Sequence, residues 1–564
     1  MLKGNNELPR PRVAGLMQDT PLLISDVIIH ADKFHADREI ISRLPETPTQ
    51  LHYSNYRTAA KHSRQLANAL LTKFNIQQGD IIGTLAFNHI YHFECYFGIS
   101  GIGAVLHTVN PRLFPEQLEY IINHANDRML FIDTACVSIL CNTLKDGKKI
   151  NCVEHIVILT EPQHHKQYAS QLSDALRQYK CNAKVHNYIE LLNDQSDQIQ
   201  WPSFNDSTAS SLCYTSGTTG NPKGVLYSHR STIMHSTAVM SRDVLGVYSG
   251  DSICLVVPLF HVNAWGVPYA AAACGARLLM PGTASDGANL TDLIIKGEAT
   301  VVLGVPTVYL GLFQFWDSKG MREFKSLDRV VIGGSAAPES MIRRFLNMNV
   351  AVLHAWGMSE MSPLGSTGQL LPKHRSYTQD QLLKVLVKQG RGVFGVQMRI
   401  VDENGAELAW DGKQAGELQV RGPWVTRAYF RIGSESSNVQ TGNEKPNTDN
   451  ARWFSTGDVC TIDSDGYIQI TDRSKDVIKS GGEWISSIDL ENVVVGHDAV
   501  QEACVVGHHH TKWQERPLLL VVLKEGKSAT AEDIKQYLKP KIISWWMPNV
   551  CIYFNMMIQC NRIY

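Results

Sequence analysis

Short apolar segments alternate with amphipathic segments along most of the chain. Residues 54–74 carry apolar side chains at helical spacing, and after Gly79 they give way to the apolar run 81–87. Further apolar runs of strand length follow at residues 129–132, 155–159, 300–303, 329–332 and 351–353. Strands that are separated by helices predict α/β layers built on parallel sheets.

The same kind of pattern restarts after Asp472, which indicates a second unit. The expected elements are a helix at 487–495, strands at 503–507 and 518–523, and a helix at 531–538. A chain of 564 residues also exceeds the usual size of one domain. We therefore predict a large N-terminal domain of stacked, mostly parallel sheets with helices at 1–472, and a small, mobile α+β cap domain at 473–564.

Composition and charge exclude several classes of protein. The net charge is -1 at pH 7, so nothing favours nucleic acid or an anionic membrane as a partner. Residues 1–7 lack the apolar core of a signal peptide, and the 12 cysteines include no C-x-x-C pair, which is typical of reduced thiols. We expect a cytoplasmic protein with small-molecule substrates and at most peripheral membrane contact, and we leave a homodimer open.

Two segments invite a wrong interpretation, and a third is plainly a loop. Residues 253–280 are apolar enough to suggest a membrane span, but they include prolines, a histidine and an arginine. We predict a strand at 253–257, a loop, a helix of small residues and a second strand. The triplet 508–510 is all histidine, yet consecutive side chains do not face one another, so a solvated turn is favoured over a metal site. The polar residues 431–450 should form a surface loop.

The run from Cys213 to Gly224 (Cys-Tyr-Thr-Ser-Gly-Thr-Thr-Gly-Asn-Pro-Lys-Gly) carries the most chemistry. It lies between predicted strands at 210–214 and 225–227. Glycines allow a tight turn that brings several N–H groups onto one target, hydroxyls add donors, and Lys223 adds a point charge. The run therefore predicts a polyphosphate site. Its order, G-x-x-G-x-x-K-G, differs from that of a Walker A loop.

A second group of candidate residues follows the predicted strand 351–353. Trp356 offers a flat surface for a base, Gly357 permits close backbone approach, and Ser359 is a donor for phosphate. Glu360 supplies an oxygen ligand of the kind that Mg²⁺ prefers. These groups suit a nucleotide site, although the motif alone also fits an ordinary strand end with an exposed acid.

Other motifs suit the remaining parts of a nucleotide and acyl-carrier chemistry. Asp458, in a Thr-Gly turn, is a short carboxylate that could bind the vicinal hydroxyls of a ribose. The pair Gly481-Gly482 lets the backbone approach another group closely. Residues 258–266, with the small residues that follow, could shape an apolar tube, but core packing explains Trp265 equally well.

These motifs together resemble those of the adenylate-forming superfamily, which includes acyl-CoA synthetases, firefly luciferase and the adenylation domains of peptide synthetases. Residues 214–224 look like its phosphate-loop signature. Residues 354–360 are similar to its aromatic-Gly-x-Thr-Glu motif with Ser359 in place of Thr, and 333–338 resemble its adenine-binding stretch. The resemblance covers about residues 24–548 and implies that ATP activates a carboxylate to an acyl-adenylate.

The resemblance also implies roles for individual residues. Those expected at the chemistry are Lys223, His261, Ser359 and Glu360, with Thr215 and Glu360 as metal ligands. Those expected to bind ATP or AMP are Thr215, Ser216, Gly217, Thr218, Thr219, Gly220, Gly334, Ser335, Ala336, Trp356, Gly357, Met358, Asp458 and Arg473. Trp356 would lie against adenine, Asp458 and Arg473 would bind the ribose, and Lys475 would be the hinge of the cap.

Two stretches narrow the resemblance to CoA ligases of fatty acids. Residues 477–486 are similar to the CoA-ligase form of their motif, which implies that CoA contacts Ser480, Gly481, Gly482 and Trp484. Residues 258–266 closely resemble the medium- and long-chain fatty acid branch. That likeness implies that the acyl group contacts His261, Trp265 and Gly266.

The chain departs from the family pattern after residue 548. Family members continue into a Pro-x-Thr-x-x-Gly-Lys loop whose lysine acts in adenylation. Residues 549–564 contain neither lysine nor glycine, and the last lysine is Lys541, so the adenylation lysine is left unassigned. The apolar residues 550–558 are at risk of failing to pair and exposing a sticky segment.

We predict that the chain converts a fatty acid to acyl-CoA through an acyl-adenylate, releasing AMP and pyrophosphate. ATP, Mg²⁺ and CoA are the implied cofactors and co-substrates. Three alternatives stay open: a ligase of the same family for short or substituted carboxylates, an oxygen-using reaction of the luciferase type, and a homologue that binds ATP and fatty acid without turnover.

Overall fold

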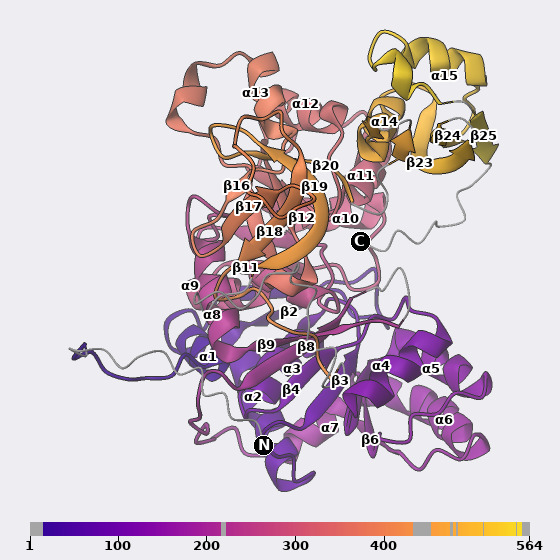
Figure 1. Ribbon diagram of the computed structural model, residues 1–564. Coiled ribbons are helices and arrows are strands. Elements are labelled where there is room, and N and C mark those ends of the chain that lie inside the picture. Colours follow the sequence, from indigo (N-terminus) through magenta and orange to yellow (C-terminus); the bar gives the residue numbers. More distant parts are fainter. Residues whose placement is uncertain are drawn as a thin grey trace.

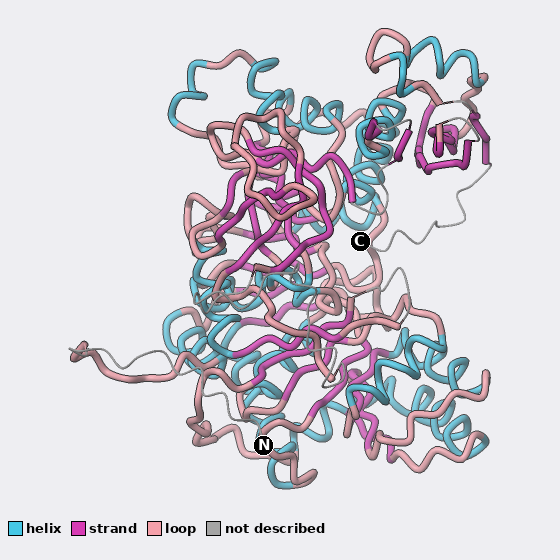
Figure 2. The backbone as a smooth tube through the Cα atoms, in the orientation of Figure 1, coloured by secondary structure: helices cyan, strands magenta, loops and turns pink. Residues whose placement is uncertain are grey.

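The computed structural model describes residues 15–215, 221–431, 453–473, 478–480, 483–510, 513–548 and 550–554. In these residues the chain forms four sheets. Two large sheets stack in the lower and middle parts of Figure 1, a smaller one lies above them, and the cap stands at the upper right in yellow. Figure 2 shows the strands gathered in the interior with helices flanking them. The predicted α/β organisation is confirmed.

The first large sheet has seven strands in the order β7-β6-β5-β3-β4-β8-β9. Its strands are β3 (Ile81–Leu85), β4 (Val105–Thr108), β5 (Met129–Asp133), β6 (His155–Leu159), β7 (Lys184–Asn187), β8 (Ala209–Tyr214) and β9 (Gly224–Ser228). All neighbours are parallel except β8 and β9, which pair antiparallel. The only antiparallel pair of this sheet among the described residues is thus the one that flanks the predicted phosphate loop.

The second large sheet has nine strands in the order β16-β15-β14-β13-β12-β10-β11-β1-β2. Its strands are β1 (Glu39–Ser42), β2 (His52–Asn55), β10 (Ser252–Leu255), β11 (Arg277–Met280), β12 (Val301–Gly304), β13 (Arg329–Ile332), β14 (Ala351–Gly357), β15 (Leu364–Thr367) and β16 (Arg391–Gly392). The strands from β1 to β14 in this order are parallel, and the strands at both edges are antiparallel.

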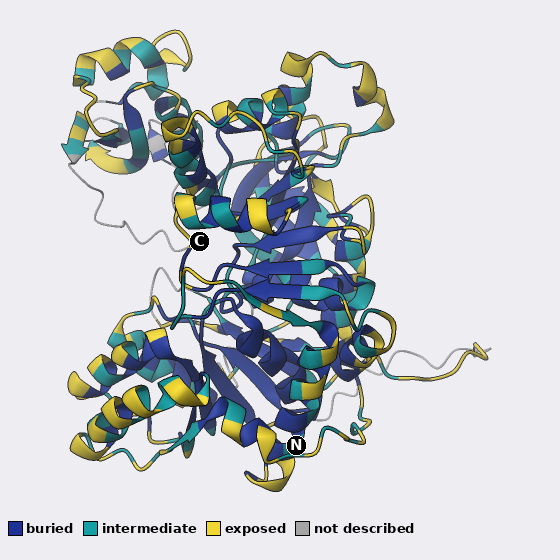
Figure 3. Cartoon of the chain, turned by 180° about the vertical axis from the view of Figure 1, so that it is seen from behind, coloured by how far each residue is buried: buried dark blue, intermediate teal, exposed yellow. Residues whose placement is uncertain are grey.

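Helices cover both faces of the two large sheets, and one set lies between them. The shared core contains residues of α1 (Ile24–Phe34), α2 (Tyr56–Thr72), α3 (Ile90–Ser100), α7 (Tyr188–Asn193), α8 (His229–Met240) and α9 (Val267–Cys274). The outer face of the seven-stranded sheet packs on α4 (Pro115–Ala125), α5 (Thr134–Lys145) and α6 (Pro162–Gln178). The outer face of the nine-stranded sheet packs on α10 (Gly287–Lys296), α11 (Pro306–Ser318), α12 (Glu339–Asn347) and α13 (Gln379–Leu386). Figure 3 shows the buried strands between the more exposed helices.

A four-stranded antiparallel sheet follows, which the sequence pattern does not predict. Its order is β17-β18-β19-β20, with β17 (Gln397–Val401), β18 (Gly416–Arg421), β19 (Phe454–Ile462) and β20 (Ile468–Arg473). The segment 454–458, which includes the Thr-Gly turn expected at Asp458, belongs to strand β19. Most of the loop expected at 431–450 lies outside the described residues.

The cap is a small α+β unit, as expected. It contains β21 (Ile478–Ser480), β22 (Glu483–Ile485), β23 (Val500–His510), β24 (Gln514–Leu523), β25 (Val550–Phe554), α14 (Ser487–Val495) and α15 (Ala531–Leu538). Both helices match their predicted bounds. One expectation is wrong. The histidines at 508–510 end strand β23 instead of forming a turn, because they pair with β24. Residues 550–554 do pair, lying parallel to β24 from Leu518 to Val522.

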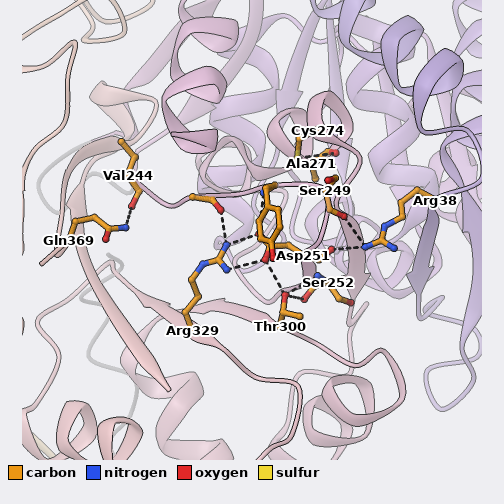
Figure 4. Close-up of polar contacts among 12 residues, drawn as sticks. Arg38, Val244, Ser249, Asp251, Ser252, Ala271, Cys274, Thr300, Arg329 and Gln369 are labelled. Atoms are coloured by element: carbon orange, nitrogen blue, oxygen red, sulfur yellow. Dashed lines mark hydrogen bonds and ion pairs between the residues drawn. The ribbon is translucent and has the colours of Figure 1, made fainter. Parts of the chain in front are cut away.

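The amino ends of β10, β12 and β13 are held together by a buried ion pair (Figure 4). The carboxylate of Asp251 is fully buried and accepts from Arg329 Nη2 at 2.6 Å and Nη1 at 3.0 Å. Thr300 Oγ1 donates to the same carboxylate at 3.2 Å, and Arg38 Nη2 donates to the backbone oxygen of Asp251 at 3.1 Å. These contacts fix the edge of the sheet opposite to the carboxyl ends of its parallel strands.

The membrane interpretation of residues 253–280 fails. They form β10, the short helical turn Val262–Gly266, α9 and β11. Within the described part of the chain, no helix is long and apolar enough to cross a membrane.

Candidate active site

The predicted motifs meet at the carboxyl ends of the parallel strands. Residues 258–266 follow β10, residues 333–338 follow β13, and 354–360 span the end of β14. Ligands of open α/β sheets bind at this edge because loops, rather than helices, cover it. The neighbouring strand pair β8–β9 brings the phosphate loop to the same region.

The described ends of the phosphate loop are closed by the sheet. Tyr214 pairs with Gly224, and the N–H of Thr215 donates to the carbonyl oxygen of Lys223 at 2.9 Å. Residues 216–220, which carry most of the predicted phosphate contacts, lie outside the described residues. Lys223 is exposed, and its Nζ lies 4.9 Å from the centroid of the Tyr429 ring. The lysine is therefore accessible to a charged ligand.

The predicted metal ligand Glu360 lies in a buried polar contact. It belongs to a short helical turn, Ser359–Met361, and is 6% exposed. Tyr429 Oη donates to Glu360 Oε1 at 2.6 Å, and the N–H of Thr426 donates to the Glu360 backbone oxygen at 2.7 Å. Tyr429 is a residue that the sequence does not single out, because it lies 69 positions from its partner.

The carboxylate of Glu360 is suited to Mg²⁺. Mg²⁺ in proteins is usually held by one or two carboxylates together with water and substrate phosphates. Within the described ranges, no group of three or more histidine, cysteine or acidic side chains could hold a metal. Glu360 would therefore hold Mg²⁺ together with the phosphates of a bound nucleotide. A site made of protein ligands alone fits these residues less well. Thr215, the other expected ligand, lines a pocket beside the loop.

The predicted adenine and ribose residues are in contact. Trp356 Nε1 donates to Asp458 Oδ2 at 2.9 Å, although the two residues are 102 positions apart. Both are buried, and the backbone of Asp458 pairs with that of Arg473 in the β19–β20 ladder. The side chain of Arg473 lies outside the described residues. The structure therefore brings the expected aromatic and acidic groups together at one place.

The predicted adenine-binding turn is held by a histidine. His354 Nε2 accepts from the N–H of Ala337 at 3.3 Å, so Nδ1 carries the proton and donates to the carbonyl oxygen of Leu386 at 3.3 Å. Complete burial lowers the pKa of His354 to about 4. The ring is neutral at pH 7 and links β14 to the turn at 333–338.

The predicted acyl motif adopts a left-handed turn. Five consecutive residues from Val262 to Gly266 have φ between 46° and 72°. A non-glycine residue in this region costs roughly 1–2 kcal/mol, so the surroundings must stabilise the turn. Asn263 contributes to this, because its Nδ2 donates to Ser211 Oγ at 2.7 Å and its Oδ1 accepts from Cys213 Sγ at 3.4 Å. No sequence pattern indicates this turn.

The turn places Trp265 and Gly266 against other parts of the site. Trp265 is partly buried, and a Cβ at Gly333 would lie only 3.0 Å from its ring. A Cβ at Gly266 would lie 2.6 Å from Nδ1 of His235, a buried side chain whose pKa burial lowers to about 3. The partly buried indole therefore lies beside the adenine turn and also packs against the large core cluster, so both interpretations of Trp265 stay open.

His261 opens onto a pocket beside the phosphate loop. The pocket is lined by Thr108, Asn110, Leu113, Ile121, Tyr214, Thr215 and His261. Burial, with a smaller contribution from the charge of Arg112, lowers the pKa of His261 to about 4. The imidazole is therefore neutral at pH 7 and can donate a hydrogen bond to a carboxylate without carrying a charge.

The predicted CoA and hinge residues belong to the cap. Ser480 is fully buried, and its Oγ accepts from Arg516 Nη1 at 3.1 Å. The backbone of Trp484 pairs with that of Lys479, but its side chain lies outside the described residues, as do Gly481, Gly482 and Lys475. The CoA contacts and the hinge stay predictions.

Comparison with known proteins gives consistent results over nearly the whole chain. The family model for AMP-binding enzymes matches residues 30–430, and that for the C-terminal domain of AMP-binding enzymes matches 489–558. The 3-methylmercaptopropionyl-CoA ligase of Ruegeria lacuscaerulensis is 45% identical over 540 residues, 96% of this chain and 95% of that protein. The medium-chain-fatty-acid–CoA ligase of Ectopseudomonas oleovorans is 41% identical over 540 residues, 96% of this chain and 93% of that protein.

Solved structures show the same fold. The structure of an anthranilate CoA ligase in complex with anthranoyl-AMP superposes with a TM-score of 0.78 at 22% identity, covering 96% of this chain and 95% of that one. With family models that match most of its length and relatives that align over nearly all of it, the chain belongs to the AMP-binding enzymes and, among them, to the CoA ligases, which are enzymes of the acid–thiol ligase type.

Proposed function

We propose that the protein activates a fatty acid with ATP to an acyl-adenylate and transfers the acyl group to CoA, releasing pyrophosphate and AMP. The observation that carries this proposal is the convergence of the Trp356–Asp458 pair and the linked side chains of Glu360, Tyr429 and Lys223 at one edge of the sheets. Such a reaction requires an aromatic surface for the base and a carboxylate that accepts hydrogen bonds from the ribose. It also requires an acidic metal ligand and a cation that binds phosphate.

The residues of the site suit separate parts of the adenylation step. Lys223 would stabilise the charge that develops on the leaving pyrophosphate, and Ser359 would donate to the α-phosphate. Neutral His261 would orient the attacking carboxylate by donating a hydrogen bond to it. Mg²⁺ bound at Glu360 would neutralise further phosphate charge. These assignments follow the resemblance and the geometry together.

The acyl group is best explained as a medium-length aliphatic chain. Trp265 lies at the boundary between the acyl motif and Gly333, where its indole would limit the length of an acyl tube unless it moves. A relative at 41% identity is named as a medium-chain-fatty-acid–CoA ligase, which supports this choice, and one at 37% is named as a long-chain-fatty-acid–CoA ligase, which supports an aliphatic chain more generally. A short thioether acid is the second candidate, because two relatives at 45% and 42% identity are named as 3-methylmercaptopropionyl-CoA ligases.

A panel of carboxylic acids separates these substrates. Pyrophosphate release would be measured with ATP, Mg²⁺ and CoA for straight-chain acids of increasing length and for 3-methylmercaptopropionate. A maximum at a straight-chain acid of medium length supports the first candidate, and a maximum at the thioether acid supports the second. Light emission or CO₂ release in place of acyl-CoA would indicate the luciferase-type reaction instead.

The C-terminal segment adds a separate proposal about rate. The last lysine of this 564-residue chain is Lys541, and no lysine is present at 549–564 to act in adenylation. We expect slow formation of acyl-adenylate from ATP and acid, but ready formation of acyl-CoA from preformed acyl-adenylate and CoA. Chromatography of AMP and acyl-CoA follows both half-reactions. Fast adenylation by this chain would contradict the expectation and would mean that another group replaces the lysine.

A further inference from the structure

A single segment joins the two charged groups of the candidate site. Residues 424–431, here called the strap, connect the four-stranded sheet to β9. The N–H of Phe430 donates to the carbonyl oxygen of Gly224 at 2.8 Å, and the two residues form an antiparallel bridge. A Cβ at Gly224 would lie 3.1 Å from Cβ of Phe430, so glycine at this position permits the close approach.

The strap is anchored at both of its ends. At its start, Trp424 Nε1 donates to the carbonyl oxygen of Leu364 at 3.0 Å. At its end, Arg431 Nη1 donates to the carbonyl oxygen of His124 at 2.8 Å. These contacts, together with the bridge to β9, restrict how far the residues between them can move.

Tyr429 is the residue of the strap that faces the site. Its hydroxyl donates to Glu360 Oε1 at 2.6 Å, and its ring lies 4.9 Å from Lys223 Nζ. A cation within about 6 Å of an aromatic ring centroid is attracted by the ring. One side chain therefore contacts both the predicted metal ligand and the predicted phosphate-binding lysine.

Packing alone does not explain a tyrosine at this position. The ring packs against the small cluster of Cys213, Val225 and Tyr227, a role that phenylalanine would also fill. Tyrosine differs from phenylalanine only in its hydroxyl, which donates a hydrogen bond to a carboxylate. A hydrogen bond to a charged group is about twice as strong as one between two neutral groups. The hydroxyl is the donor in this contact, since an ionised carboxylate can only accept.

We propose that Tyr429 is a positioning residue that orients the Glu360 carboxylate for a divalent cation through its hydroxyl and holds the Lys223 ammonium at the phosphate site through its ring. The inference rests on the proposed function, since it concerns the binding of ATP and its cation. One tyrosine makes two contributions, and they can be told apart because the hydroxyl can be removed alone or together with the ring.

The test measures nucleotide binding, independently of turnover. Calorimetry would give the Kd of α,β-methylene-ATP with Mg²⁺ and with EDTA, for the wild type, Tyr429→Phe and Tyr429→Leu. Tyr429→Phe removes the hydroxyl and keeps the ring, whereas Tyr429→Leu removes both. Tyr467→Phe is the control for loss of a tyrosine hydroxyl, because Tyr467, which is more buried than Tyr429, donates its hydroxyl to the backbone oxygen of Gln369 at 2.7 Å.

The expected pattern distinguishes both contributions. In Tyr429→Phe the gain in affinity from Mg²⁺ should fall about fivefold to tenfold, while the Kd in EDTA changes less than about twofold. Tyr429→Leu should also weaken binding in EDTA, and Tyr467→Phe should behave as wild type in both conditions. If Tyr429→Phe does not fold, Tyr429→His, which keeps a ring and a donor, should retain more of the Mg²⁺ gain than Tyr429→Leu.

Two different results would overturn two different claims. The positioning role would be refuted if Mg²⁺ raised the affinity for the analogue as much in Tyr429→Phe as in the wild type. It would also be refuted if Mg²⁺ raised that affinity equally in Tyr429→His and Tyr429→Leu. Both results would leave the proposed function intact. A wild-type protein that binds the analogue neither with Mg²⁺ nor with EDTA would refute the proposed function itself.

Discussion

The nucleotide half and the acyl half of the candidate site are built in different ways. In the nucleotide half, side chains from distant segments pair directly, as Trp356 does with Asp458 and Tyr429 does with Glu360. In the proposed acyl half, the distinguishing feature is the backbone, because Val262–Gly266 turns through five left-handed residues. One half depends on which polar groups are present, and the other depends on an unusual backbone conformation.

This difference predicts how each half should respond to substitution. Removing a polar group that faces a ligand leaves the packing largely unchanged, so the nucleotide half should lose rate or affinity before it loses stability. A residue that cannot adopt the left-handed turn must strain or displace the surrounding structure. The acyl half should therefore lose stability and function together.

The largest effect is expected for Gly266→Ala. The new Cβ would lie 2.6 Å from His235 Nδ1, at a residue whose φ is 72°. Crowding and left-handed strain together should cost about 2–4 kcal/mol of unfolding free energy, measured by urea denaturation. Gly311→Ala is the control, since nothing lies within 4 Å of its added Cβ on helix α11 and alanine favours helix. Equal stabilities for the two variants would remove the distinction between the halves.

The next largest effect is expected in the nucleotide half. Lys223→Ala and Glu360→Gln should each slow pyrophosphate release by at least about tenfold, or about 1.4 kcal/mol of transition-state stabilisation. Their thermal midpoints should stay close to that of the wild type, because Lys223 is exposed and glutamine at 360 can still accept from Tyr429. Wild-type rates in both variants would show that these residues do not serve the reaction.

Trp265→Ala sharpens the comparison within the acyl half. Because the indole is only partly buried, its loss should cost less than the roughly 3–5 kcal/mol of a large core residue. We expect the preferred acid in the panel to become longer, while the Kd for ATP changes little. Trp410→Ala, at an exposed tryptophan, provides the control for stability. Lower stability with an unchanged preference would assign Trp265 to the core.

The smallest effect concerns pH and His261. Its pKa is lowered to about 4, so the unfolded chain takes up a proton near pH 6.5 that the folded chain does not. Stability should therefore fall as the pH falls through this window, and His261→Gln should reduce the loss by about 1 kcal/mol at pH 5.5. Thermal midpoints at pH 7.5 and 5.5 measure this. An identical loss in the variant would mean that His261 titrates normally.

The sequence predicts side-chain chemistry better than it predicts backbone geometry. Periodicity is sufficient for β6, β13, α14 and α15, whose observed bounds match the predicted ones, because apolar patterning governs such elements. The four-stranded sheet is missed because β17, β18 and β20 alternate apolar and polar residues, whereas the predicted strands are mostly continuous apolar runs. Pairing between β24 and β25 is missed because parallel contacts depend on residues far apart in the chain.

The site shows the same limit. Trp356, Glu360 and Asp458 can be selected from residue type and motif, because a nucleotide needs those groups. Tyr429 cannot, since only the folded chain brings it to Glu360. The left-handed turn is hidden for a different reason: four of its five residues are not glycine, so no local signal indicates a positive φ.

The account rests most directly on the identity of the products. Purified protein would be incubated with ATP, Mg²⁺, CoA and a medium-chain fatty acid, and the products would be separated by chromatography and identified by mass. The account predicts acyl-CoA, AMP and pyrophosphate in equal amounts, with acyl-adenylate accumulating when CoA is omitted. Formation of ADP and phosphate, or of acyl-CoA without AMP, would contradict activation through an adenylate.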